Sequence, residues 1–105
     1  MTIKRISSTG DLNNILQENT NVIINFGAAW SAPSNVMNSE FQKLAHANTN
    51  AGNLAFAEVN TDEHSEIAAA YNISGMPTFV LVNNGQVQET TRDASGIQGL
   101  INRAA

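Results

Sequence analysis

The sequence predicts an α/β fold in which helices cover both faces of a central mixed β-sheet. Short apolar runs alternate with segments of helical periodicity, in the order β-α-β-α-β-α-β-β-α. Helical crossovers require parallel strands, whereas the Asn84-Gly85 turn requires an antiparallel pair, so the sheet must be mixed. No linker or repeat interrupts the chain, and we expect residues 1–105 to form one domain.

The first half of the chain predicts two strands and two helices. Ile3–Ile6 suits a short edge strand, and residues 7–11, SSTGD, offer N-caps for a helix. Val22–Phe26 is apolar except for Asn25, as expected of a strand covered on both faces. Pro33 suits the first turn of a long helix. The core-facing positions predicted for these helices are Leu12, Ile15 and Leu16, then Met37, Phe41, Leu44 and Ala45.

The second half predicts three strands and two helices. Leu54–Val59 and Phe79–Val82 have the composition of buried strands, and the Asn-Gly turn leads into a strand over Gln86–Thr91. Between them, NTDEHSE at residues 60–66 offers caps and first-turn acids for a helix, and we assign Asp62, Glu63 and Glu66 to that turn. The core-facing positions predicted for the two helices are Ile67 and Tyr71, then Ile97, Leu100 and Ile101.

Composition excludes several classes of protein. Nine acidic against five basic residues give a net charge of −4 without a basic cluster, so we expect neither nucleic acid nor a membrane surface as a partner. There is no cysteine, which excludes disulfides, thiolate metal sites and thiol catalysis in this chain. No apolar run is long enough to span a membrane and no signal peptide is recognisable, so we expect a soluble, cytoplasmic protein. The Met start and the completed last helix suggest that little is missing.

The two histidines do not indicate catalysis or metal binding. We expect His46, late in the long helix, and His64, near a helix start, on solvent faces far from residues 30–34. A serine hydrolase would need a base hydrogen-bonded to its nucleophile, and neither histidine suits that role. No set of ligands for a metal ion is apparent, and we expect no cofactor.

Two short motifs carry a resemblance to a known family. Trp30-Ser31-Ala32-Pro33-Ser34 lies between a strand and a helix, and Met76-Pro77-Thr78 precedes a strand. With the order of elements, these motifs resemble the thioredoxin family over essentially the whole chain. In that family the tryptophan is followed by Cys-x-x-Cys, and here serine occupies both cysteine positions. Other positions that match the family pattern are Phe26, Ala28, Asn60, Asp62, Tyr71, Ile73, Gly75 and Gly85.

The resemblance implies a protein disulfide oxidoreductase site at a helix start. The positive end of the helix dipole favours a thiolate there, but it cannot ionise a serine hydroxyl, so we expect the chain as written to be redox-inactive. The family's cis-proline corresponds to Pro77, beside which an extended peptide of a protein partner would bind. A partner similar to thioredoxin reductase is also implied. The implied catalytic positions are Ser31 and Ser34, and the implied substrate-binding residues are Trp30, Ala32, Pro33, Gly75, Met76 and Pro77.

Several departures from the family pattern leave two interpretations open. Asn25 and Glu58, which we expect to support the site, stand where the family usually has a buried aspartate and a lysine. Gly27 replaces an aromatic residue, and a family glycine is missing near Arg92 and Asp93. The chain is either a thioredoxin whose two cysteines were changed to serine, or a natural non-catalytic binding domain. The second interpretation has a parallel in the amino-terminal domains of multidomain monothiol glutaredoxins. For Ser31 and Ser34 a plain helix-capping role is compatible with both interpretations.

Overall fold

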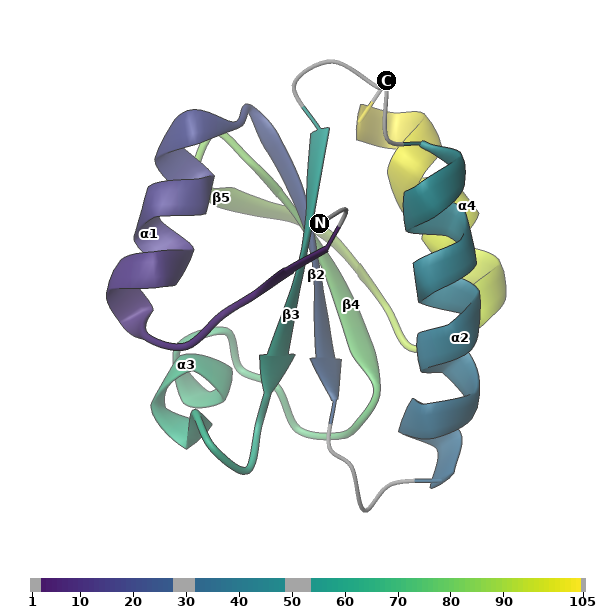
Figure 1. The fold of residues 1–105 in the computed structure, drawn as a ribbon, viewed down its shortest axis with the longest axis horizontal. Coiled ribbons are helices and arrows are strands. Elements are labelled where there is room, and N and C mark those ends of the chain that lie inside the picture. The colour runs from purple at the N-terminus through teal and green to yellow at the C-terminus, as the bar shows by residue number, and fades with distance from the viewer. Residues whose placement is uncertain (1–2, 28–31, 49–53, 105) are drawn as a thin grey trace.

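A mixed β-sheet with helices on both faces forms the fold (Figure 1). The computed structural model describes residues 3–27, 32–48 and 54–104, with the backbone alone for residues 32–37 and 94. The element order is the predicted one. The bounds are β1 (Ile3–Arg5), α1 (Thr9–Glu18), β2 (Asn21–Gly27), α2 (Ala32–Ala47), β3 (Leu54–Asn60), α3 (Ser65–Ala70), β4 (Thr78–Asn83), β5 (Gln86–Thr91) and α4 (Ala94–Ala104).

The sheet has the strand order β1-β3-β2-β4-β5. The strands β1 and β2 run parallel to β3, whereas β4 is antiparallel to both β2 and β5. The prediction of a mixed sheet with β1 at one edge is therefore confirmed. Because of these directions, the ends of β2, β3 and β5 and the start of β4 meet at one end of the sheet, where Gly27, Asn60, Thr78 and Thr91 lie. We call this the site end of the sheet.

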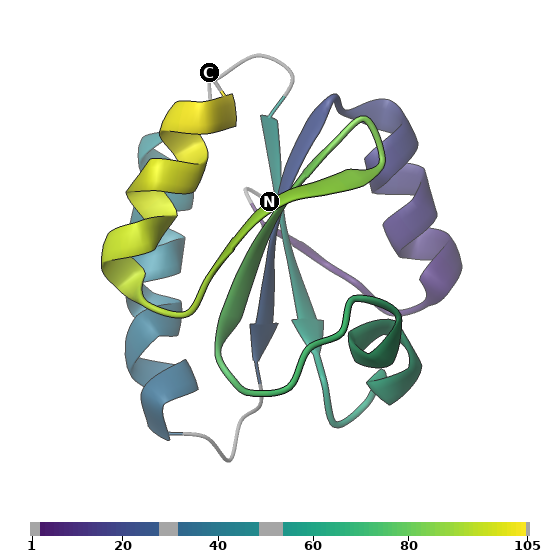
Figure 2. The same cartoon turned by 180° about the vertical axis from the view of Figure 1, so that it is seen from behind.

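Each face of the sheet has its own apolar core. Figures 1 and 2 show α1 and α3 over one face and α2 and α4 over the other. On the second face the Phe41 ring stacks on Phe79 at a centroid distance of 5.6 Å and meets Phe56 edge-on at 5.9 Å. The predicted core positions that are buried are Leu12, Ile15, Phe41, Ala45, Ile67, Ile97, Leu100 and Ile101, while the side chain of Met37 lies outside the described part. These contacts fix α2 and α4 against the sheet.

A side-chain cap sets the start of α1, and backbone conformation sets the turn between β4 and β5. The Ser8 side chain accepts a hydrogen bond from the Asp11 N–H at 3.0 Å and caps α1, as the sequence predicts. Asn84 and Gly85 have φ values of 50° and 80°, which close the tight hairpin between β4 and β5.

No helix in the described ranges is long and apolar enough to cross a membrane. The cytoplasmic location stays a prediction.

The start of α3 differs from the prediction. The helix begins at Ser65, because the Asn60 side chain accepts a hydrogen bond from the Asp62 N–H at 2.9 Å and holds the preceding residues in a turn. The assignment of all three acids to the first turn is therefore wrong: Glu66 lies there, but Asp62 and Glu63 precede the helix.

Candidate functional site

The segment before β4 lies at the site end of the sheet. The peptide bond between Met76 and Pro77 is cis. The Thr78 hydroxyl donates a hydrogen bond to the Gly75 carbonyl at 2.6 Å, which ties the segment to the start of β4. Pro77 is buried, whereas Gly75 and Met76 are half-buried. Within the described ranges, the N–H and C=O of Met76 form no hydrogen bond with another residue.

The start of α2 follows β2 in the chain. The helix begins at Ala32, so Pro33 and Ser34 lie in its first turn, which carries no acidic residue. The expectation that Ser34 caps the helix is wrong, because an N-cap residue precedes the first helical residue whereas Ser34 lies two positions inside it. Trp30 and Ser31 lie outside the described residues. The first turn of a helix presents unpaired N–H groups and a partial positive charge, which favour a negatively charged group.

Asn25 lies beneath α2 in the middle of the sheet. Its side-chain amide donates a hydrogen bond to the Asn38 Oδ1 at 2.9 Å, and only 6% of Asn25 is exposed. Glu58 is its neighbour in the pairing of β2 with β3 and is half-buried. A buried polar side chain needs a hydrogen-bond partner, and Asn38 of α2 supplies one for Asn25. An amide in this position can position a neighbouring group, but it cannot serve as a general acid or base.

Arg92 is a site residue whose position the sequence does not predict. It follows β5, and its guanidinium group lies over Gly75: a Cβ atom built on that glycine would be 2.8 Å from Cζ and 2.9 Å from Nη1 of Arg92. A larger residue at position 75 would therefore displace the guanidinium group. The sequence offered one signal, the absence of the family's glycine in this region.

Asp93 caps the last helix. Its carboxylate accepts hydrogen bonds from the Ser95 hydroxyl at 2.7 Å and from the Gly96 N–H at 3.0 Å. The bond from Ser95 lowers the pKa of Asp93 below its ordinary value, and the bond from Gly96 acts in the same direction. The carboxylate next to Arg92 in sequence is thus engaged by the start of α4.

The histidines occupy different environments. His46 is exposed on α2, as expected. The expectation of a solvent-facing His64 is wrong, because 17% of its side chain is exposed. His64 is the N-cap residue of α3, where its carbonyl accepts hydrogen bonds from Ile67 and Ala68, and its Nδ1 lies 3.7 Å from Glu66 Oε1. Among the described residues, no group of three histidine or acidic side chains could hold a metal ion.

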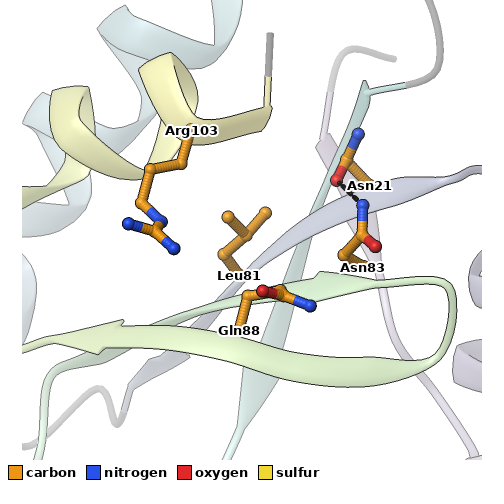
Figure 3. A pocket seen from close by; sticks show the side chains of 5 residues that line it. All are labelled: Asn21, Leu81, Asn83, Gln88 and Arg103. Atoms are coloured by element: carbon orange, nitrogen blue, oxygen red, sulfur yellow. Dashed lines mark hydrogen bonds between the residues drawn. The ribbon is translucent and has the colours of Figure 1, made fainter.

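A polar pocket of about 220 Å³ lies at the end of the sheet opposite the site end. Sequence analysis does not predict this pocket. Figure 3 shows Leu81 between Arg103 of α4 and the Asn21–Asn83 pair. The Asn83 amide donates to Asn21 Oδ1 at 2.7 Å, and the Asn21 amide donates to the Ala104 carbonyl at 3.2 Å. Because these amides bind one another and the end of α4, they join the helix to the sheet at one wall of this pocket.

Comparisons with known proteins agree with this architecture. Residues 5–105 match the family model described as Thioredoxin. The thioredoxin of Mycoplasma genitalium is 42% identical over 83 residues, which cover 79% of this chain and 78% of that protein. Monothiol glutaredoxin-S17 of Arabidopsis thaliana is 33% identical over 93 residues, which cover 89% of this chain but 18% of that longer protein.

The fold is also that of solved thioredoxins. The structure of Plasmodium falciparum thioredoxin superposes with a TM-score of 0.88 at 29% identity, covering 97% of this chain and 99% of that one. The predicted sheet with helices on both faces and the cis peptide bond before β4 are thus accompanied by similarity in sequence along nearly the whole chain. On this evidence the chain belongs to the thioredoxin family.

Proposed function

We propose that the chain as written binds an extended segment of a protein partner along Gly75–Pro77 and does not exchange disulfides. The observation that carries this proposal is that no other residue in the described part of the chain pairs with the main chain of Met76, a half-buried residue directly before the buried Pro77. An extended peptide can satisfy such an N–H and C=O in the manner of an added strand. The hydrogen bond from Thr78 to Gly75 supports this role, because it holds the segment in place before a partner arrives.

The absence of exchange follows from the chemistry at positions 31 and 34. Disulfide exchange requires a thiolate that attacks a disulfide sulfur, and the chain contains no cysteine. A helix dipole supplies far less free energy than the ionisation of a serine hydroxyl at neutral pH requires. We therefore assign Ser31 and Ser34 no role in exchange, and a reductase partner would find no disulfide to reduce in this chain.

Peptide binding is tested by titrating the ¹⁵N-labelled chain with a blocked, uncharged, extended peptide of about nine residues and recording amide chemical shifts. We expect saturable shifts at the amides of Gly75, Met76 and Thr78. The amides of Asn84 and Gln86, in the hairpin at the other end of β4, serve as internal controls and should not move. Shifts confined to the hairpin, or none at all, would refute the proposed binding surface.

A second candidate function is that of a disulfide oxidoreductase scaffold from which both thiols are missing. The first turn of α2 supports it, because no acidic side chain there opposes a thiolate. The test is insulin-disulfide reduction driven by dithiothreitol, comparing the chain as written with the Ser31→Cys/Ser34→Cys variant. We expect the chain as written to add nothing to the rate with dithiothreitol alone and the variant to accelerate reduction strongly.

The matched control is the single Ser31→Cys variant, which can attack a disulfide but lacks the second thiol that resolves the mixed disulfide. Its mixed disulfides can be resolved only by dithiothreitol, so its turnover should be much slower than that of the double variant. A folded double variant without activity would refute the second candidate and leave binding alone. Turnover by the chain as written would refute the first proposal.

A further inference from the structure

A positively charged side chain lies beside the Gly75–Pro77 segment, although the chain as a whole is negatively charged. The net charge is −4, yet the side chain that lies against Gly75 is the cation of Arg92. The three heavy atoms nearest to a Cβ built on Gly75 are Nη2, Cζ and Nη1, so the charged head of the side chain, rather than its apolar stem, occupies this place. A planar group with five donors thus lies against Gly75, the residue before the half-buried Met76.

This guanidinium group has no acidic partner in the described part of the chain. The ion pairs found there join His64 to Glu66 and Arg103 to Glu89, at 3.7 and 3.5 Å. The carboxylate nearest in sequence, Asp93, is bound by Ser95 and the Gly96 N–H at the start of α4. No carboxylate of the described residues therefore pairs with the guanidinium group of Arg92.

We propose that Arg92 is a specificity-determining residue, which selects partner segments that carry an aspartate or glutamate next to the residue paired with Met76. This inference rests on the proposed binding of an extended segment along Gly75–Pro77. A carboxylate is the side chain that matches the guanidinium fork. Because Arg92 is exposed, the preference should be modest, about twofold to fivefold in the dissociation constant, and should weaken with salt.

The test uses two pools of blocked nonapeptides that differ at one position. All positions are random among uncharged residues except the central one, which is glutamate in one pool and glutamine in the other. Each pool is titrated into the ¹⁵N-labelled chain in 50 mM and 500 mM NaCl, and the amide shifts of Gly75 and Met76 give the apparent dissociation constants. The same titrations are made with Arg92→Gln and with Arg103→Gln. The second variant loses the same charge from an exposed arginine at the far end of α4.

We expect the chain as written and Arg103→Gln to prefer the glutamate pool about twofold to fivefold in 50 mM NaCl, and Arg92→Gln to bind both pools equally. The preference should shrink in 500 mM NaCl. Equal binding of both pools by the chain as written, or a preference that survives Arg92→Gln, would overturn this inference and leave peptide binding intact. If neither pool shifted Gly75 and Met76 in any chain, the proposed function itself would fail, and this inference with it.

Discussion

The hydrogen bond between Asn25 and Asn38 offers a quantitative test of how the sheet holds α2. Asn25 is 6% exposed on β2, and its amide donates to Asn38 Oδ1 at 2.9 Å. Replacing Asn38 with alanine leaves the buried amide of Asn25 without this acceptor. We expect that change to lower the free energy of unfolding by about 1–3 kcal/mol, the cost of an unsatisfied buried polar group.

Removing the donor, Asn25, should change the free energy of unfolding by a different amount than removing the acceptor. Asn25→Ala leaves the acceptor of Asn38 unpaired, but Asn38 is only half-buried and water can reach it, so this part of the loss should be about 1 kcal/mol. The removal of a buried side chain adds a cavity term to it. Once one partner is absent, removing the other costs less, so the double variant should be more stable than the sum of the single changes predicts. We expect a coupling energy of about 1 kcal/mol.

Urea denaturation of the four proteins measures this coupling. A loss of 2 kcal/mol moves the midpoint by about 1 M, well outside the error of the measurement. The control cycle pairs Asn25→Ala with Asn13→Ala, an exposed asparagine on α1 at the opposite face of the sheet, where the effects should add. A coupling energy between Asn25 and Asn38 no larger than that of the control cycle would refute the argument that this bond stabilises α2 on the sheet.

Two further predictions concern α4 and the single tyrosine. Gly96→Ala should lower the free energy of unfolding by about 1–3 kcal/mol, since its Cβ would lie 2.7 Å from the Thr91 Cβ, whereas Gly99→Ala, whose Cβ meets nothing within 4 Å, should raise it by about 0.5–1 kcal/mol. If both substitutions shifted the thermal unfolding temperature in the same direction, the close approach of Gly96 to Thr91 would be contradicted. Burial raises the pKa of Tyr71 above its ordinary value of 10.0, so its absorbance titration should have a higher midpoint in the folded chain than in urea. Folding favours the protonated phenol, so the stability that depends on protonated Tyr71 is fully present below pH 10 and is lost as the pH rises through the pKa of the folded chain. Identical titration midpoints in the folded chain and in urea would contradict this argument.

Sequence periodicity predicts the elements of this fold better than the details of the site. The strands and helices follow from apolar spacing, which depends on residues close together in the chain. The prediction that Asp62 and Glu63 lie in the first turn of α3 was wrong because the Asn60 side chain binds the backbone N–H of Asp62 and competes with the helix. The partial burial of His64 and the contact between Arg92 and Gly75 depend on how separate segments pack in three dimensions. No local pattern encodes such a contact.

The two parts of the proposed site respond differently to substitution. Disulfide exchange depends on sulfur atoms, so the proposed lack of exchange depends only on the side chains at positions 31 and 34 and requires no change in strand order. The proposed binding along Gly75–Pro77 would depend instead on main-chain groups, whose positions follow from the sheet and from the bond between Thr78 and Gly75. A domain built in this way can lose its chemistry and keep its partners. Selection would then act on side chains that border the main-chain surface, and Arg92 is such a side chain.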